Sequence, residues 1–331
     1  MTRALRLLTA LAAATTVLAA PVAAQDHGGT PAAAQAAEAS GLPAQAGAQR
    51  PNEPVDIITP HITDAHELEL PGPPPTFVTH VHLPQWAPVQ VPGLGLVDFS
   101  PTKHVVFMLI AALSAAALLI GVARAHAKHT HRAGVPKGFA AGMEGMVLYL
   151  RNEVILPNVG HHGNGFVPFL LTLFFFILFC NLWGIVPWGA TATGNIAVTA
   201  TLAIITFLVI EIAGMRANGA GYLNTIFYWN TELPLAMRIP MFLIMTPIEI
   251  VGKLTKPFAL MIRLFANMTA GHIVVLALIG MIFTFKSLAS GAPFLMAVAI
   301  NVLELFVAFL QAFIFTLLSS VFIGQIREAH H

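Results

Sequence analysis

The segment LMIRLFANMTAGH, residues 260–272, places an arginine inside an apolar run. From Pro257 to Phe283 the only other titratable side chain is His272. The guanidinium of Arg263 stays protonated under ordinary conditions. A charged side chain in the middle of a bilayer costs about 2.5–3.5 kcal/mol on insertion scales. Apolar neighbours, which contribute about 0.3–0.6 kcal/mol each, offset that cost for insertion but do not explain why the charge is kept.

The composition of the chain is that of an integral membrane protein. Of its 331 residues, 56% are hydrophobic and 9% are charged, whereas soluble domains carry about 25% charged residues. The mean hydropathy is +0.77. The net charge of +1 is uninformative and no basic tract indicates a nucleic-acid partner. Cys180 is the only cysteine, which excludes an internal disulfide.

Residues 1–24 have the pattern of an export signal. Arg3 and Arg6 precede an apolar stretch, and a small-residue cleavage motif ends at Ala24. The alternative is an uncleaved membrane anchor. The apolar part is shorter than the about 20 residues that a span requires, which favours cleavage.

Residues 25–103 are predicted to form an exported N-terminal arm. The first part, 25–55, is rich in Ala, Gly, Pro and Gln and has no periodicity, which is typical of a flexible segment. The Pro-rich remainder, 56–103, indicates extended segments and turns. The spacing of its four histidines fits no standard metal site, so we interpret them as surface residues and expect neither metal nor cofactor: His61, His66, His80 and His82.

Residues 104–123 are the first expected transmembrane helix. A basic cluster follows it, whereas 25–103 holds two bases and eight acids. By the positive-inside rule the arm faces out and the loop after the helix faces the cytoplasm. A lipid contact or a histidine metal site in this loop is an alternative explanation of its composition. The basic residues are Arg124, Lys128, Arg132 and Lys137.

Residues 124–165 are predicted to contain a cytoplasmic loop and an amphipathic surface helix over 136–155. The membrane core, 166–331, consists of a hairpin, 166–188 and 195–214, and two long helices over about 239–286 and 293–326. The C-terminus then lies in the cytoplasm. The sequence thus predicts an all-α membrane protein with about five transmembrane helices and one surface helix.

The last two helices are long for a membrane. Over 258–285 and 294–326 they would measure about 42 and 50 Å at 1.5 Å per residue, against a hydrocarbon core of about 30 Å. We therefore expect them to tilt or break. A tilted, antiparallel pair would offer a broad face to another membrane component.

Further polar side chains lie in these helices. Asn267, four residues after Arg263, shares its face, whereas His272 points to the opposite side. Glu304 and Gln311 are seven residues apart and share a face of the last helix, and Glu249 precedes Arg263 by fourteen residues. A structural ion pair between Arg263 and a carboxylate is one interpretation. The whole set indicates a proton path, because His and Glu exchange protons and Arg does not.

In this hypothesis His272 and Glu304 bring a proton in from one side and Glu249 serves an exit on the other. Arg263 would block a direct leak and would ionise any carboxylate that passes it. A partner must supply that mobile carboxylate, since none is evident in this chain.

The chain resembles the subunit a family of F-type ATP synthases. The likeness rests on residues 247–272, PIEIVGKLTKPFALMIRLFANMTAGH, and 303–324, LELFVAFLQAFIFTLLSSVFIG, with support from NLWGIVP (181–187) and TGNIAVT (193–199). It spans about 166–326. The resemblance implies a proton channel subunit without a nucleotide site, in a bacterial inner membrane. The implied partners are a rotating c-subunit ring, the peripheral-stalk b subunits, the rest of the synthase and lipid.

The resemblance also implies roles for single residues. Arg263 would face the ring carboxylates, and Glu249 would belong to the cytoplasmic half-channel. The inlet half-channel from the outside would contain Asn267, His272, Glu304 and Gln311. The imidazole favours protons over sodium ions.

Two departures from the family pattern stand out. Many relatives have Glu and His where this chain has His272 and Glu304, so one imidazole and one carboxylate are kept. Some relatives carry an Asp in the loop of the hairpin, whereas GATATGN, residues 189–195, has no acid.

Two other classes remain as alternatives. A proton-coupled secondary transporter would use Arg263 for an anionic substrate, although no internal repeat is evident. A structural membrane scaffold would tolerate Glu304→Gln.

Overall fold

The structure is a computed structural model, and it describes residues 63–71, 78–91, 95–97, 100–130, 138–160, 163–186, 189–222, 226–227, 234–285 and 290–328. The expected signal segment, 1–24, lies outside the described residues, and so does the expected arm up to residue 62, including His61.

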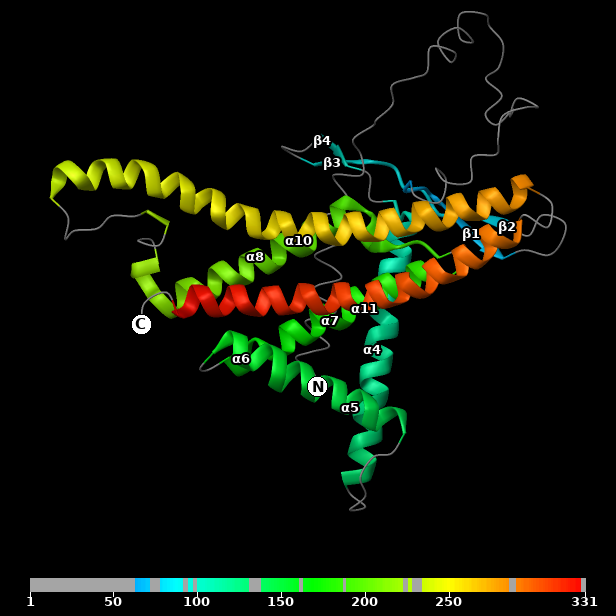
Figure 1. Cartoon of the computed structure of the whole chain (residues 1–331), viewed down its shortest axis with the longest axis horizontal. Coiled ribbons are helices and arrows are strands. Elements are labelled where there is room, and N and C mark those ends of the chain that lie inside the picture. Colours follow the sequence, from blue (N-terminus) through cyan, green and yellow to red (C-terminus); the bar gives the residue numbers. More distant parts are fainter. Residues whose placement is uncertain are drawn as a thin grey trace, which may run out of the picture.

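Among the described residues, five helices are long and apolar enough to cross a membrane. They confirm the predicted all-α membrane class and the expected number of spans. They are α4 (Lys103–Thr130), α7 (Val167–Ile185), α8 (Ile196–Asn218), α10 (Leu235–Phe285) and α11 (Gly291–Glu328). Figure 1 shows α10 and α11 running side by side along the length of the molecule, with α4 crossing them.

Between α4 and α7, residues 139–159 are helical. They form α5 (Phe139–Tyr149), a π-helical turn over Leu150–Ile155 and the short α6 (Leu156–Val159). Met143, Val154 and Val159 are buried, whereas Phe139 and Tyr149 are exposed apolar side chains. A helix with one packed side and one exposed apolar side agrees with the predicted surface helix.

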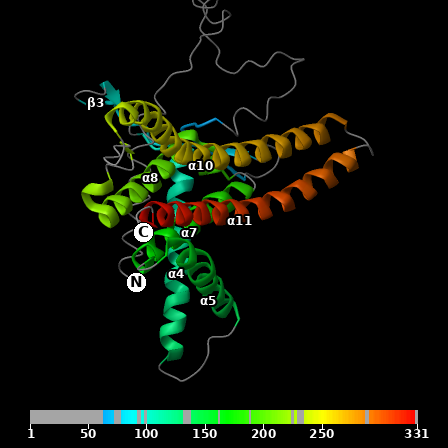
Figure 2. The same cartoon turned by 60° about the vertical axis from the view of Figure 1, so that its left-hand side comes forward.

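α7 lies at the centre of the packing because it is apolar on every side. Phe174, Phe175 and Phe176 are at most 1% exposed, so three consecutive side chains, pointing in different directions, are all covered. α4 and α11 both pack against α7. Figure 2 shows α7 beneath α11, with α4 passing through the same region.

α10 is continuous over its 51 residues despite Pro240, Pro247 and Pro257. A long apolar segment was expected either to tilt or to break, and α10 does not break. At 1.5 Å per residue it measures about 77 Å, and α11 about 57 Å. The tilt of the two helices in a membrane stays a prediction.

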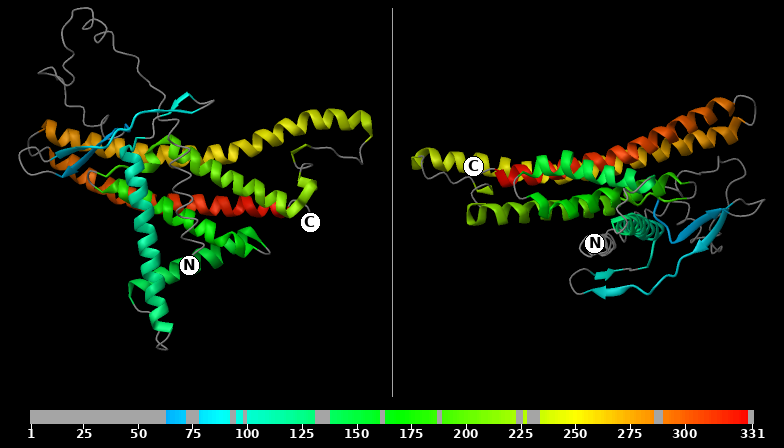
Figure 3. Two further views of the ribbon diagram at one scale, coloured as in Figure 1. Left: turned by 180° about the vertical axis from the view of Figure 1, so that it is seen from behind. Right: turned by 90° about the horizontal axis from the view of Figure 1, so that it is seen from below.

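The described part of the arm contains four short strands in two antiparallel pairs. β1 (Glu67–Pro71) pairs with β2 (Val78–His82), placing Glu67 opposite His82. β3 (Val89–Val91) pairs with β4 (Gly95–Val97). These hairpins agree with the extended segments and turns expected over 56–103. Figure 3, right, shows the strands on the far side of the helices from the α10–α11 layer.

Candidate functional site

Two hydrogen bonds between predicted site residues join α10 to α11. His272 Nδ1 lies 2.7 Å from Glu304 Oε1, and the Asn267 amide donates to Gln311 Oε1 at 3.0 Å. The partner residue number falls on α11 as the number rises on α10, so the two helices run in opposite directions. Four of the six predicted site residues are thus brought together in pairs.

The His272–Glu304 pair is largely removed from solvent, with side chains 20% and 6% exposed. The other ring nitrogen, Nε2, lies 2.8 Å from the Gly184 carbonyl oxygen and 3.1 Å from Thr191 Oγ1. Because a carbonyl only accepts, Nε2 carries a hydrogen. The short contact on the other side then holds one proton, either on Nδ1 beside a carboxylate or on Oε1 beside a neutral ring. The two side chains therefore share one proton.

Glycines make these close contacts possible. A Cβ atom at Gly184 would lie 1.7 Å from Thr191 Oγ1, and one at Gly271 would lie 3.0 Å from Glu304 Oε1. Such distances leave no room for a side chain at Gly184 and crowd the carboxylate at Gly271. The hairpin loop and the carboxylate of α11 reach the imidazole only because both positions lack a side chain.

The loop between α7 and α8 is fastened to the same region. Thr193 Oγ1 donates to Asn181 Oδ1 at 2.6 Å, and the fully buried Asn181 donates to the Ala308 carbonyl oxygen of α11 at 3.2 Å. Asn181 and Thr191 were not predicted as site residues. Polar side chains in and beside an apolar hairpin were the available signal.

Arg263 is half-buried, and its Nη1 is buried without a hydrogen-bond partner among the described residues. No ion pair joins Arg263 to a carboxylate in that part of the chain. The structural ion pair considered above is therefore not found there. Arg263 borders the exposed face of α10, since Ile262 and Ala266 are exposed while Leu260 and Leu264 are buried. The guanidinium stands where a neighbouring molecule could approach it.

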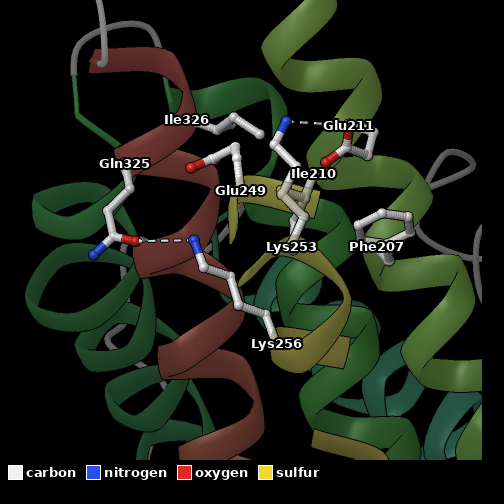
Figure 4. A pocket seen from close by; sticks show the side chains of 8 residues that line it. All are labelled: Phe207, Ile210, Glu211, Glu249, Lys253, Lys256, Gln325 and Ile326. Carbon is white, nitrogen blue, oxygen red and sulfur yellow. Dashed lines mark hydrogen bonds and ion pairs between the residues drawn. The ribbon is translucent and has the colours of Figure 1, made fainter. Parts of the chain in front are cut away.

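Glu249 belongs to a second polar cluster, whose side chains Figure 4 shows; along α10 it lies on the N-terminal side of Arg263, whereas His272 lies on the C-terminal side. It lines a pocket of about 120 Å³. In this cluster Lys253 Nζ lies 3.7 Å from Glu211 Oε2 and donates to the Tyr222 hydroxyl at 2.7 Å. The lining residues come from α8, α10 and α11: Phe207, Ile210, Glu211, Glu249, Lys253, Lys256, Gln325 and Ile326.

Tyr222 connects this cluster to the end of α8. Its hydroxyl donates to Glu211, and the side chain is 2% exposed. Burial, followed by the Glu211 carboxylate, raises the pKa of the phenol well above its ordinary value of 10. Tyr222 therefore stays protonated and acts as a fixed donor. Neither Glu211 nor Tyr222 was predicted, although a carboxylate inside the apolar segment 195–214 was a visible signal.

The two clusters are separated along α10, with Arg263 between them. At 1.5 Å per residue, Arg263 is about 15 Å from Lys253 and about 14 Å from His272 along the helix axis. The structure therefore does not bring Glu249 to the His272–Glu304 pair. A fixed positive charge lies between two sets of groups that can bind protons.

Comparison with known sequences identifies the family. The family described as ATP synthase A chain matches residues 105–324. The chain belongs to the ATP synthase A chain family. The match includes α4 to α11 almost completely, and so all six predicted site residues, Glu211 and Tyr222.

Relatives cover most of the chain as well. ATP synthase subunit a of Chloroherpeton thalassium is 48% identical over 274 residues, which is 82% of this chain and 77% of the relative. ATP synthase subunit a 2 of Chlorobaculum tepidum is 43% identical over 305 residues, 91% of this chain and 79% of the relative. ATP synthase subunit a of Anaeromyxobacter sp. (strain Fw109-5) is 42% identical over 83% of this chain and 71% of the relative.

Proposed function

We propose that this chain is the proton-translocating subunit a of an F-type ATP synthase, with two offset half-channels separated by Arg263. The relatives carry the name ATP synthase subunit a. The observation that supports the two-channel mechanism most directly is the buried Nη1 of Arg263, which has no partner among the described residues and lies between two proton-binding clusters. The transporter alternative finds no support in these relatives.

The inlet half-channel passes through the His272–Glu304 pair. Because the pair holds one proton between Nδ1 and Oε1, a second proton that reaches the pair would release the first toward the partner ring against α11. Asn267 and Gln311 continue the polar path toward Arg263. A ring carboxylate that has been protonated here loses its charge and can rotate into lipid.

Arg263 separates loading from unloading. A protonated carboxylate that returns to the guanidinium ionises, because a neighbouring positive charge lowers the pKa of a carboxyl group. The released proton leaves through the cluster of Glu249, Glu211, Lys253 and Tyr222. The same charge repels hydronium, so the two half-channels do not join.

The partner surface is the exposed face of the two long helices. In the apolar span Met237–Ile282 of α10, only Thr246, Leu260, Leu264 and Met268 are buried. α11 exposes Phe294, Leu295, Val302 and Phe306 to at least 56%. We assign this face to the c-subunit ring, whose carboxylates would meet Arg263. Peripheral-stalk b subunits, the remaining synthase subunits and lipid would contact other surfaces, and nucleotide chemistry would take place on other subunits.

The orientation follows from charge. The arm would lie outside a bacterial inner membrane, after removal of residues 1–24, and the basic loop and C-terminus would lie in the cytoplasm. The arm and the loop of GATATGN then share the outer side with the inlet. The Glu211 cluster lies toward the cytoplasm.

Arg263→Ala in the assembled synthase tests the proposal. ATP-driven acidification of inverted membrane vesicles should be abolished, because nothing ionises the returning carboxylate, while ATP hydrolysis stays detectable. Arg216→Ala is the matched control, since Arg216 is an exposed arginine at the end of α8, and it should pump like the wild type. Coupled pumping by Arg263→Ala would disprove the proposed role.

A further inference from the structure

Asp64 of the arm makes three contacts with the membrane helices. Its Oδ1 lies 2.8 Å from His104 Nδ1 and accepts from the His104 backbone N–H at 3.4 Å. Its Oδ2 accepts from the Asn195 amide at 3.2 Å. His104 is 4% and Asp64 20% exposed. The carboxylate is thus held between the start of α4 and the start of α8 and keeps some contact with solvent.

The neighbouring backbone holds this part of the arm in place. The Lys103 N–H donates to the Ala65 carbonyl oxygen at 2.9 Å, and His66 Nδ1 lies 3.3 Å from the Pro101 carbonyl oxygen. Asp64 is therefore part of a docked segment. Its position does not depend on a single side-chain contact.

Asn195 links Asp64 to the inlet. Its Oδ1 accepts the Ala197 N–H as the cap of α8, which leaves its NH₂ group for Asp64. Four residues earlier in the same loop, Thr191 contacts His272. One short loop, residues 189–195, therefore touches the His272–Glu304 pair at one end and Asp64 at the other. The loop itself contains no titratable side chain.

We propose that Asp64 is the acid–base group at the outer mouth of the inlet half-channel, supplied by the arm to a loop that has none. This inference rests on the proposed function. The Asp64 carboxylate takes a proton from hydronium, releasing water, and the resulting carboxylic acid gives that proton to water on the loop side. Asp64 returns to the carboxylate, and one proton has moved inward toward His272.

The charges around Asp64 fit this role. Burial raises the pKa of the carboxyl group, but the hydrogen-bonding and electrostatic contacts with His104 outweigh burial and place the pKa below its ordinary value of 3.8. Asp64 is therefore ionised at neutral pH. A negative charge at the mouth of a path raises the local concentration of protons. Lys103, next to His104, is 8% exposed and is the nearby fixed positive charge on α4.

Asp64→Asn separates proton transfer from anchoring. Asparagine keeps an oxygen that can accept from Asn195 or His104, but it does not titrate. In inverted vesicles stripped of the soluble head, passive proton conduction through the membrane sector should fall at least about tenfold in Asp64→Asn, within the range of general acid–base effects, and Asp64→Glu should restore most of it. Glu67→Gln is the matched control, an arm carboxylate 46% exposed beside His82, and should conduct like the wild type.

A purely structural role predicts different results. Asp64→Asn would then conduct like the wild type while Asp64→Ala would not, and that outcome would overturn the inference. His104→Gln is a second variant, independent of any change at Asp64. Loss of the imidazole raises the pKa of Asp64, so the pH dependence of conduction should shift to higher pH; an unchanged profile would also overturn it.

The Arg263→Ala variant tests the proposed function independently of the role of Asp64. If Arg263→Ala abolishes coupled pumping and Asp64→Asn conducts normally, the proposed function stands and only the role of Asp64 fails. If Arg263→Ala still pumps, the proposed function fails whatever Asp64 does.

Discussion

His272 and Glu304 illustrate how one proton can be shared at a buried site. The Gly184 carbonyl oxygen requires a hydrogen on Nε2, so only the proton between Nδ1 and Oε1 is exchangeable. The pair is neutral overall when the imidazolium faces the carboxylate and also when neutral imidazole faces the carboxylic acid. It can pass a proton on without leaving an unpaired charge in an apolar region, which would be costly.

Exchanging the two residues tests whether they act as one unit. His272→Glu and Glu304→His should each lower ATP-driven pumping at least about tenfold, a change of about 1.4 kcal/mol in a barrier, because each leaves two like groups facing one another. The double variant should pump better than either single variant. Its recovery should be partial, since a carboxylate at position 272 must be protonated to donate to the Gly184 carbonyl oxygen.

ATP-driven pumping is measured in inverted vesicles as the quenching of a pH-sensitive dye. ATP hydrolysis is recorded in parallel to show that the synthase is assembled. A double variant no better than the singles would argue against a shared relay. Glu304→Gln with wild-type pumping would point instead to a scaffold.

At the scale of the elements, the site depends on how closely the hairpin loop approaches α7. Thr191 packs directly onto Gly184, and Thr193 and Asn181 hold the loop against α11. Helix α10 then presents His272 to this loop. The loop is positioned by helix-to-helix contacts, so its geometry follows from packing and not from its own composition.

Gly184→Ala should disturb this arrangement. The added methyl group would lie 1.7 Å from Thr191 Oγ1, so the loop must move away and Thr191 must lose its contact with His272. Overpacking of this kind costs about 1–3 kcal/mol. We expect slower pumping and a lower melting temperature of the purified complex.

Gly142→Ala is the matched control for that experiment. It is also a glycine inside a helix, and a Cβ there meets nothing within 4 Å. It should leave pumping unchanged and favour the helix slightly. Equal behaviour of the two alanine variants would show that the Gly184–Thr191 contact does not matter.

At the scale of the whole molecule, the long helices form one outer layer and the described strands of the arm lie on the opposite side (Figure 3). The outer layer is apolar and largely exposed, and it carries Arg263 at its border. The opposite side carries Asp64 and the two hairpins. The rotating partner and the arm would therefore contact the subunit from different sides.

A photocrosslinking residue at Phe306 should report the partner. Phe306 on α11 is 62% exposed, and p-benzoylphenylalanine at this position should crosslink to the c subunit in the assembled synthase. Phe139 on α5 is a matched control at 68% exposure and should not crosslink to the ring. Crosslinks to the ring from Phe139 but not from Phe306, detected by mass spectrometry, would place the ring on another face.

The sequence by itself determined the membrane class, the number of long helices and the unusual charges within them. The two signals behind these predictions, long apolar runs and charges within them, are local in the sequence. A bilayer requires about 20 consecutive apolar residues, and a charge inside such a run is conspicuous because it is costly. Arg263, His272, Glu304 and Glu249 are visible for this reason, and their roles stay predictions.

Only the tertiary structure decided which of these groups meet. It joined Asn267 to Gln311, brought Thr191 to His272, and placed Glu211 and Tyr222 beside Lys253. It also brought Asp64 to Asn195 across 131 residues of chain. Such contacts depend on the rotation and crossing of whole helices and on glycines that permit close approach, and these are set by packing between distant segments.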